Sequence, residues 1–411
     1  MYGNSKRFKM AEQTLEKFIS EYINSQNVPV VRFVWHGGEP LMLETDFYKK
    51  AIELQNKYSN GKRIENVIQT NGTLLNDDWC HFLRENNFLV GISIDGPEHL
   101  HDRYRLNKAG KPSFGQTMKG LELLVRHNVE FNTMTALNDY NVLFPLEIYR
   151  FLKGIGSRYM QFTPVVERIA ANGSENSMNL LSGADQADNS LASWSVKALD
   201  YGRFLCELFD QWVVQDVGKY YVTVFDSVLA NYVGKIPSTC VHAETCGHAV
   251  ALEHNGDLFA CDHYVFPEYK LGNIHNDSLI SMIYSQQQIA FGQAKSNALP
   301  QYCRKCEYLF VCNGECPKNR IINTPTGEAG LNYLCSGLRL FYKHVIPYIK
   351  FMADELVNER SPANVMVWAR EREKANSRNN ETKAKTKPND DCPCASGKKF
   401  KFCCRNKIFI Q

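Results

Sequence analysis

The chain has 411 residues, 44% of them hydrophobic and 22% charged, which is enough for two or three domains at about 150 residues each. Such a chain buries a large core without disulfides, so a disulfide-stapled miniprotein is excluded, and its 26 Gly and 15 Pro exclude a disordered or collagen-like chain. The formal net charge of +3 is the sum of +7 in residues 370–411 and −4 before them, which excludes a nucleic-acid footprint for the body but not for the tail.

Strand-like and helix-like segments alternate along the first 168 residues. Hydrophobic spacing and β-branched or aromatic runs predict helices at 10–23, 46–58, 77–86, 116–126 and 146–155, and strands at 30–35, 64–70, 88–94, 131–136 and 159–165. This alternation predicts a parallel sheet with helices outside it. It opens on a helix, whereas a barrel of β–α units normally begins with a strand, so the first strand and its loop are expected to be missing. The first three strands run into Gly, Asn or Asp, which predicts a pocket at their carboxyl ends.

The next region is predicted to be irregular before it becomes helical. Residues 169–198 are polar, small and aperiodic, and we expect a flexible excursion there. Residues 199–239 are expected to form a connecting helical region. Cys206 in its first helix and Cys80 in an earlier helix are most simply small buried residues. The sequence has neither a run of eighteen apolar residues nor a signal-peptide core, so we expect a cytoplasmic protein without membrane contact.

Eight cysteines follow in residues 240–350. They are Cys240, Cys246, Cys261, Cys303, Cys306, Cys312, Cys316 and Cys335. Clustered cysteines in a reducing compartment bind metal more often than they form disulfides. Eight thiolates hold either two structural zinc ions or two [4Fe–4S] clusters, and the spacing alone does not choose between them.

Six stretches of the chain carry a resemblance to a known family. They read WHGGEP at 35–40, QTNGTLLND at 69–77, SIDGP at 93–97, GSRYMQFTPVVERIA at 156–170, CGHAVALEHNGDLFACDHYVFPEYKLGNI at 246–274 and CRKCEYLFVCNGECPKNR at 303–320. Through them the chain resembles the radical S-adenosylmethionine (SAM) enzymes with a SPASM domain, and among these the anaerobic sulfatase-maturating enzymes. The resemblance runs from residue 1 to about 350. It implies an α/β fold, with a partial (β/α)6 radical SAM barrel in residues 1–168 that lacks its first strand and a SPASM iron–sulfur domain in residues 240–350.

The resemblance also implies which cysteines act together. One auxiliary [4Fe–4S] cluster would be held by Cys240, Cys246, Cys261 and Cys316. The other would be held by Cys303, Cys306, Cys312 and Cys335. The two sets are interleaved along the chain, which proximity in the sequence would not have suggested.

A SAM site is implied at the carboxyl ends of the first three strands. The GGEP loop, whose backbone meets the SAM amino group, is matched by Gly37, Gly38 and Glu39, and glycine permits that close approach. The positions that hydrogen-bond the SAM ribose are matched by Ser93 and Asp95, although Asp95 also fits an ordinary turn residue. The mouth of the site would be lined by Gln69, Thr70 and Asn71.

The family cleaves SAM at a third cluster, held by C-x3-C-x2-C after the first strand, and this sequence contains no such motif. Cys312 and Cys316 have the C-x3-C spacing, but Asn319 stands at the third position. The opening MYGNSKRFKM resembles the residues just beyond the missing loop. We therefore expect either an N-terminally truncated chain or one that has lost the motif, and in both cases no SAM cleavage by the chain as written.

The reaction that the resemblance implies is oxidation of a sulfatase Cys or Ser to Cα-formylglycine in an unfolded or nascent polypeptide. A 5′-deoxyadenosyl radical takes a hydrogen from the substrate Cβ, a base removes the thiol or hydroxyl proton, and an electron leaves through the auxiliary clusters. Asp262, in CDH, matches that base, and a plain surface acid is the alternative. Flavodoxin or ferredoxin is the expected reductant. Two other functions stay open: another SPASM peptide-modifying maturase, or a non-catalytic remnant with two clusters.

Residues 351–391 are expected to form a helix and a polar linker before a small motif at 392–407. The cysteines of this motif, spaced C-x-C-x8-C-C, resemble the SEC-C zinc motif, with Ala395 in place of the usual Gly. They are Cys392, Cys394, Cys403 and Cys404. Four thiolates around Zn²⁺ form a closed structural site without a catalytic position. The basic side chains around it predict docking to a protein or, second, to nucleic acid.

Overall fold

The computed structural model describes residues 8–169, 191–374, 389–391, 396 and 398–402. The chain divides into two compact units. The first consists of Met1–Phe209 and Tyr220–Ile346, and the second of Asp210–Lys219 and Pro347–Gln411. The sheet and the eight cysteines of residues 240–350 all lie in the first unit.

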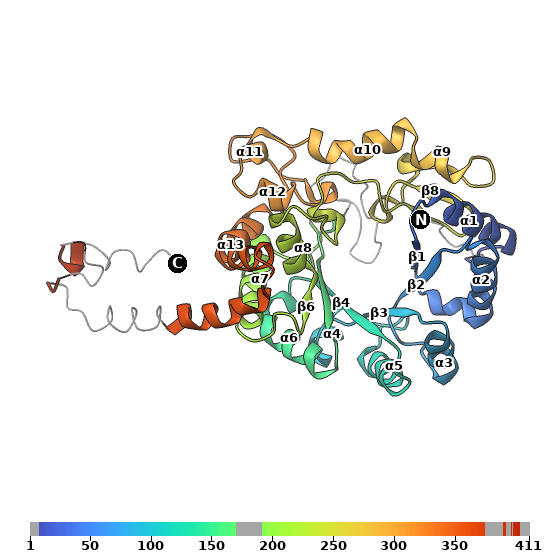
Figure 1. Ribbon diagram of the computed structural model, residues 1–411, viewed down its shortest axis with the longest axis horizontal. Helices are drawn as coiled ribbons and strands as arrows, with labels where there is room; N and C mark the ends of the chain where they lie inside the picture. Colours follow the sequence, from blue (N-terminus) through green and yellow to red (C-terminus); the bar gives the residue numbers. More distant parts are fainter. Residues whose placement is uncertain (1–7, 170–190, 375–388, 392–395, 397, 403–411) are drawn as a thin grey trace. The chain divides into compact units, whose positions relative to one another are not determined.

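A six-stranded parallel sheet forms one part of the first unit (Figure 1). Its strands are β1 (Val30–Trp35), β2 (Arg63–Thr70), β3 (Leu89–Ser93), β4 (Phe131–Leu137), β5 (Tyr159–Pro164) and β6 (Tyr221–Val222). The helices of this part are α1 (Glu12–Ser25), α2 (Glu44–Tyr58), α3 (Asp77–Glu85), α4 (Glu98–His101), α5 (Phe114–Arg126) and α6 (Pro145–Gly154). Each strand pairs with the next one in chain order, so all strands end at the same edge of the sheet.

The predicted parallel sheet with outer helices is confirmed. Figure 1 shows α2, α3, α5 and α6 along the outer side of the curved sheet. The five predicted helices and five predicted strands are present, with ends that differ by no more than two residues. The short elements α4 and β6 were not predicted. The absence of a first barrel strand stays a prediction.

Apolar side chains of α1 show why the sequence folds this way. Leu15, Ile19 and Ile23 recur every four residues on one face of the helix and are buried. They belong to one core cluster with Val31 and Phe33, which point to the same face of β1. Full burial of a side chain of this size contributes about 1.5–3 kcal/mol.

The segment expected to be flexible is in part built into the first unit. Residues 170–190 lie outside the described residues, but residues 191–198 are described. The backbone amide of Ala192 donates to the carbonyl of Glu167 at 2.9 Å, and that of Val196 donates to the carbonyl of Val165 at 2.9 Å. Val196 is fully buried. Residues 191–198 are therefore joined to the chain after β5 by backbone hydrogen bonds despite their polar composition, and their flexibility stays a prediction.

Short elements make up the cysteine-rich part of the first unit. A three-stranded antiparallel sheet contains β7 (Ala251–Leu252), β8 (Asp257–Phe259) and β9 (Lys270–Asn273). Its helices are α9 (Leu279–Ile283), α10 (Gln286–Asn297), α11 (Gln301–Arg304), α12 (Leu309–Cys312) and the beginning of α13 (Cys335–Val357). Figure 1 shows α9, α10, α11 and α12 across the parallel sheet from α3 and α5. The connecting region contains α7 (Ala198–Val213) and α8 (Thr223–Tyr232) together with β6.

The N-terminal helix joins the two parts of the first unit. Thr14 Oγ1 and His275 Nε2 lie 3.0 Å apart, and the carboxylate of Glu21 accepts a hydrogen bond from the backbone amide of Leu279 at 2.7 Å. These contacts link residues about 260 positions apart, so α1 fixes the antiparallel sheet of the cysteine-rich part against the parallel sheet.

The second unit contains the rest of α13 and a helical stretch at residues 365–374. Phe351 and Trp368 stack with ring centroids 5.2 Å apart, and Glu355 pairs with Arg360 at 2.6 Å. The four cysteines of the expected zinc motif lie outside the described residues, so the motif stays a prediction. In the part of the chain that the structure describes, no helix is both long and apolar enough to span a bilayer.

Candidate active site

The loop after β1 presents open backbone at the carboxyl end of the sheet. Gly37 has a φ of +140°, which residues with side chains rarely adopt, and both Gly37 and Gly38 are exposed. A Cβ placed on either glycine would meet no other atom within 4 Å. This is the open space that close approach of a ligand to the backbone requires. Contact with SAM itself stays a prediction.

The carboxylate of Glu39 ties this loop to the end of β2. Its Oε1 accepts hydrogen bonds from Thr70 Oγ1 at 2.7 Å and from the backbone amide of Leu41 at 3.1 Å. Its Oε2 accepts one from the backbone amide of Asn71 at 2.9 Å. Hydrogen bonds to a charged acceptor are about twice as strong as neutral ones. The predicted site residues Glu39 and Thr70 therefore bind each other and fix the two loops that would frame a ligand.

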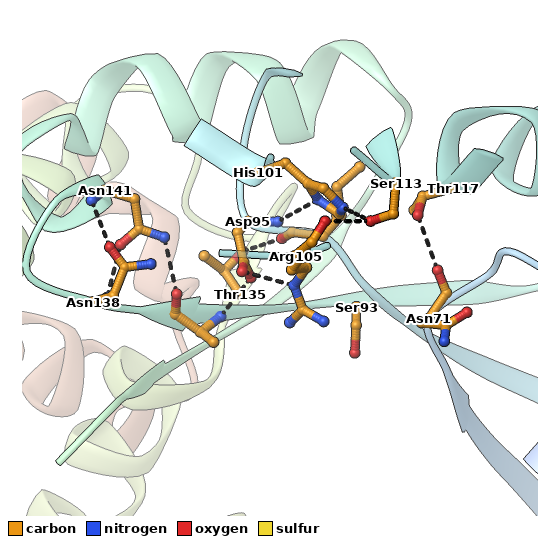
Figure 2. A network of polar contacts seen from close by, with 12 residues as sticks. Asn71, Ser93, Asp95, His101, Arg105, Ser113, Thr117, Thr135, Asn138 and Asn141 are labelled. Atoms are coloured by element: carbon orange, nitrogen blue, oxygen red, sulfur yellow. Dashed lines mark hydrogen bonds and ion pairs between the residues drawn. The ribbon is translucent and has the colours of Figure 1, made fainter. Parts of the chain in front are cut away.

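Asn71 shapes the loop after β2. Its side-chain Oδ1 accepts hydrogen bonds from the Thr73 amide at 2.9 Å and from the Thr73 hydroxyl at 2.7 Å. Its backbone carbonyl accepts a hydrogen bond from Thr117 Oγ1 at 3.1 Å (Figure 2). Asn71 thus holds the turn and joins it to α5.

Gln69 and Ser93 lie side by side on neighbouring strands. The Gln69 side-chain amide donates a hydrogen bond to Ser93 Oγ at 3.0 Å. Gln69 pairs in register with Gly91 of β3, and a Cβ on Gly91 would collide with the Gln69 side-chain oxygen. Glycine at position 91 therefore leaves room for the Gln69 side chain to lie over β3 and reach Ser93 on the same strand. Sequence reasoning named Gln69 and Ser93 but missed Gly91, whose role depends on the register between the strands.

Asp95 is buried, and protein groups bind both of its carboxylate oxygens (Figure 2). Oδ2 accepts a hydrogen bond from Arg105 Nε at 2.7 Å, and Oδ1 accepts one from the backbone amide of Ala136 at 2.8 Å. Only 2% of the residue is exposed. These contacts give Asp95 a structural role, holding the loop after β3 against β4. A contact with the SAM ribose stays a prediction.

A buried histidine supports the same loop. His101 Nδ1 accepts a hydrogen bond from the backbone amide of Asp95 at 3.3 Å, and Nε2 lies 3.2 Å from Ser113 Oγ. Burial lowers the pKa of His101 to about 4, although the nearby Asp95 carboxylate opposes the shift. The ring is therefore neutral at pH 7, and the acceptor role of Nδ1 assigns its proton to Nε2. No motif in the sequence marked His101, Arg105 or Ser113.

One face of α10 serves the first cysteine set, defined as Cys240, Cys246, Cys261 and Cys316. The buried residues of this helix are Gln288, Gly292 and Lys295, spaced by about one turn. None of the three has an apolar side chain, so hydrophobic periodicity could not reveal this face.

Gln288 and Gly292 contact the backbone at two of these cysteines. Gln288 Nε2 donates hydrogen bonds to the carbonyls of Gly247 at 3.0 Å and Ala260 at 3.1 Å, the neighbours of Cys246 and Cys261. The carbonyl of Gly292 accepts a hydrogen bond from the Cys246 amide at 3.0 Å. A Cβ on Gly292 would lie 2.7 Å from the Cys246 carbonyl oxygen, so only glycine fits.

The fourth cysteine of the first set is held by a buried glutamate. Glu315 Oε2 accepts hydrogen bonds from the Cys316 amide at 2.6 Å, from Asn332 Nδ2 at 2.6 Å and from Asn319 Nδ2 at 3.3 Å. Glu315 has a φ of 53°, which is uncommon for a residue with a side chain. Asn319, the residue that breaks the C-x3-C-x2-C pattern, thus has a structural partner close to this cysteine.

The second cysteine set, Cys303, Cys306, Cys312 and Cys335, shares one pocket. All four cysteines line it, together with Tyr308, Leu338 and Tyr342. Within the described residues, the hydroxyl of Tyr342 is buried without a hydrogen-bond partner. The four cysteines come from α11, the turn after it, α12 and α13, so the fold brings together residues up to 32 positions apart.

The pKa values of the thiols follow the same division into two sets. Burial raises the pKa to about 12 for Cys312 and Cys316 and to about 11 for Cys335. Neighbouring thiols add to the rise within each set: Cys246 and Cys240 act on Cys316, and Cys303 acts on Cys335. Buried thiolates need nearby positive charge, which bound metal supplies.

Orphaned polar atoms beside the cysteines fit a bound cluster. In the described part of the chain, three buried polar atoms have no hydrogen-bond partner: His242 Nε2 and Gln288 Oε1, near cysteines of the first set in the sequence or through hydrogen bonds, and Tyr342 OH, in the pocket of the second set. An unmade buried hydrogen bond costs about 1–3 kcal/mol, and cluster sulfur can accept such bonds. Among these described residues, no three Cys, His, Asp or Glu side chains converge closely enough to bind one metal ion.

Asp262 follows Cys261 directly and is exposed. Its Oδ1 accepts hydrogen bonds from the Cys261 thiol at 3.2 Å and from the His263 amide at 3.0 Å. The carboxylate therefore lies at the edge of the first set and is exposed to solvent. Such a group can take a proton from a substrate hydroxyl or thiol.

A small pocket adjoins Asp262. It is lined by Glu167 and Arg168, just after β5, and by His263 and Lys318 from the cysteine-rich part. Lys318 Nζ and Glu167 Oε1 form an ion pair at 2.7 Å that joins the two walls. Sequence reasoning missed this pair, because Glu167 and Lys318 are 151 positions apart.

Two family models match the chain at the regions that carry these features. Residues 2–152 match the radical SAM superfamily, and residues 240–307 match the SPASM domain, an iron–sulfur cluster-binding domain. The parallel β/α sheet thus belongs to a radical SAM enzyme, and five of the eight cysteines, Cys240 to Cys306, lie within its iron–sulfur domain.

Relatives and solved structures narrow this class. A serine-type anaerobic sulfatase-maturating enzyme of Bacteroides thetaiotaomicron is 52% identical over 366 residues, which cover 89% of this chain and 88% of that enzyme. A cysteine-type enzyme of Clostridium novyi is 32% identical over 329 residues, 79% of this chain and 83% of the relative. The structure of native anSMEcpe with bound AdoMet and the Kp18Cys peptide matches with a TM-score of 0.73 and 28% identity, covering 84% of this chain and 91% of that one. The chain belongs to the family of anaerobic sulfatase-maturating enzymes.

Proposed function

We propose that the chain oxidises an active-site Ser or Cys of a sulfatase polypeptide to Cα-formylglycine, with SAM and two auxiliary [4Fe–4S] clusters. The observation that carries the proposal is the position of Asp262. Its carboxylate contacts a cysteine of the first set, and the next residue, His263, lines the pocket after β5. These contacts support a role for Asp262 as the base between the end of the sheet and the first cysteine set.

The roles of the residues follow from this arrangement. The backbone of Gly37 and Gly38 and the side chains of Gln69 and Ser93 are proposed to bind SAM at the carboxyl ends of β1, β2 and β3. SAM supplies the 5′-deoxyadenosyl radical, which takes one hydrogen atom from the substrate Cβ. Asp262 takes the hydroxyl or thiol proton, and one electron passes to the site of the first cysteine set. For a serine, these three transfers account for the two hydrogens lost when the alcohol becomes an aldehyde.

We further propose that the target residue is serine. The relative with 52% identity is a serine-type enzyme, whereas the cysteine-type relative shares 32%. A sulfatase polypeptide that carries S-x-P-x-R is therefore the proposed substrate, and a flavodoxin or ferredoxin the proposed reductant.

The 411 residues contain no C-x3-C-x2-C, so no residue of this sequence is assigned to the cluster that cleaves SAM. We expect the chain as given to bind about eight irons, four per cluster, and to form no 5′-deoxyadenosine. An extended chain that supplies the motif ahead of residue 1 is expected to form it. The second candidate, a two-cluster protein without radical chemistry, predicts no 5′-deoxyadenosine from the extended chain either.

The test uses the extended chain, reconstituted anaerobically with iron and sulfide, with SAM, a reductant and two peptides that differ only in Ser or Cys at the target position. Mass spectrometry of the serine peptide is expected to show the loss of two hydrogens, with one 5′-deoxyadenosine per aldehyde. Formation of 5′-deoxyadenosine with both peptides unchanged would contradict the proposal and point to another peptide-modifying maturase.

A further inference from the structure

A lysine is completely buried beside the first cysteine set. Lys295, on the inner face of α10, has 0% of its surface exposed. Its Nζ donates hydrogen bonds to the carbonyl of Cys240 at 2.6 Å and to that of Val241 at 3.0 Å. It therefore holds the chain at the first cysteine of the set.

No carboxylate of the described residues forms an ion pair with this lysine within 4.0 Å. The buried carboxylate that acts on it electrostatically is Glu315, whose Oε2 is already bound by the Cys316 amide and by Asn332. An uncompensated buried charge is costly, by several kcal/mol in typical proteins.

The other groups that act on Lys295 are the cysteines of the first set, which become anionic thiolates when they bind metal. Burial lowers the pKa of Lys295, whereas Cys246, Cys240 and Cys316 favour its charged form, and no cysteine of the second set is among its main electrostatic partners.

Two other cations act on the cysteines. Arg320, which is partly buried, acts on Cys303 and Cys312 of the second set as well as on Cys246 and Cys316 of the first, and Arg339, which water and salt can reach, acts on Cys306 and Cys335. Because Arg320 acts on both sets, the two sites differ in the completely buried lysine beside the first one.

We propose that Lys295 raises the reduction potential of the group bound by the first cysteine set and so makes that site the acceptor of the substrate electron. A site with four thiolates becomes more negative when it takes up an electron. A buried positive charge beside it stabilises the reduced form more than the oxidised form. The link to the substrate rests on the proposed function, whereas the shift in potential does not.

The test measures both potentials in the chain as given, without SAM or peptide. After reconstitution with iron and sulfide, an anaerobic redox titration followed by electron paramagnetic resonance reports each site. In Lys295→Met, which keeps the length of the side chain and removes its charge, the reduction equilibrium of the first site is expected to fall about tenfold, or about 59 mV for one electron. The second site is expected to keep its potential. Lys295→Arg is expected to stay near the wild type, and Lys119→Met, an exposed lysine on α5, is the matched control.

A purely structural role predicts other results. An unchanged potential in a fully loaded Lys295→Met protein, or an equal fall at both sites, would overturn the proposal. So would a wild-type potential in Lys295→Gln, which keeps a hydrogen-bond donor without the charge. If the first site of Lys295→Met does not load, the stability of the cluster-free protein decides. If the cluster-free Lys295→Met protein is more stable than the cluster-free wild type, the charge of Lys295 opposes folding until the anionic cluster binds, as the proposal requires. If it is less stable, Lys295 has a structural role and the proposal is rejected.

Failure of the proposed function gives a separate result. If the extended chain leaves both peptides unchanged while Lys295→Met still lowers the potential of the first site alone, the role of Lys295 stands without its link to formylglycine.

Discussion

The hydroxyl of Thr70 donates a hydrogen bond of 2.7 Å to the carboxylate of Glu39, which joins the loop after β1 to the end of β2. The same carboxylate accepts the Asn71 amide through its other oxygen. Glu39→Gln replaces one acceptor oxygen with a donor, so one of these bonds must break. We expect the free energy of unfolding to fall by about 1–3 kcal/mol.

Urea denaturation of the cluster-loaded chain measures this loss. Glu53→Gln, on the exposed face of α2, is the control, because its surface pair with Lys50 is worth little. Equal stability of the two variants would mean that the Glu39 contacts do not hold the loops together.

Gly292 provides a test of how α10 positions the first cysteine set. In Gly292→Ala, the new Cβ would lie 2.7 Å from the carbonyl oxygen of Cys246, so the helix or the cysteine must move. We expect loss of about four of eight irons, with the second site intact and the helix content retained. The measurement is iron and sulfide content beside far-ultraviolet circular dichroism.

Gly115→Ala in α5 is the matched control, since a Cβ there meets no atom within 4 Å. It is expected to keep all the iron and to gain up to about 1 kcal/mol in stability. Full iron content in Gly292→Ala would show that the Cys246 backbone tolerates displacement.

His101 gives the protein a defined pH dependence. Burial lowers the pKa of His101 to about 4 in the folded chain, whereas an unfolded histidine has a pKa of about 6.5. Between these values the unfolded chain binds more protons, so stability is full above about pH 6.5 and falls as the pH drops towards about 4. The total loss from this residue is about 3 kcal/mol.

Urea midpoints at several values between pH 4 and pH 7 measure the slope. His101→Asn is expected to flatten it, while His99→Asn, at an exposed position, is expected to leave it unchanged. Burial also lowers the pKa of His242 to about 4, but His242 is present in both variants, so the difference between the slopes belongs to His101. Parallel slopes for wild type and His101→Asn would contradict the assignment.

The parallel sheet could be predicted because its signals are local. Leu15, Ile19 and Ile23 of α1 repeat at helical spacing, and the first three predicted strands run into Gly, Asn or Asp. The backbone pairing of residues 191–196 could not be predicted, because it depends on the chain after β5 rather than on their own composition. Tertiary context overrides a polar composition there.

The candidate site was predictable only in part. The residues at the strand ends and the eight cysteines carry motifs, but their partners do not. Asp95 is held by Arg105 and Ala136, and the first cysteine set is supported by Gln288, Gly292 and Lys295. Polar residues and glycine on a buried helix face lack hydrophobic periodicity, so only the fold reveals them.

Replacement of Asp262 tests whether this residue is needed for oxidation of the peptide or for binding of the iron–sulfur clusters. In the extended chain with the SAM-cleaving motif, Asp262→Asn keeps the size of the side chain and removes its ability to take a proton. Cys261 remains in place, so we expect about the wild-type iron content, continued formation of 5′-deoxyadenosine and loss of aldehyde formation by at least about a hundredfold, the usual contribution of a general base. Mass spectrometry of the serine peptide and iron analysis measure the two properties on the same sample.

Glu268→Gln is the matched control, because this carboxylate is exposed on the same segment six residues further on. It is expected to leave both iron content and peptide oxidation unchanged. Full activity of Asp262→Asn would reject the assignment of the base. Loss of iron together with activity would show that Asp262 supports the site of the first cysteine set rather than the substrate.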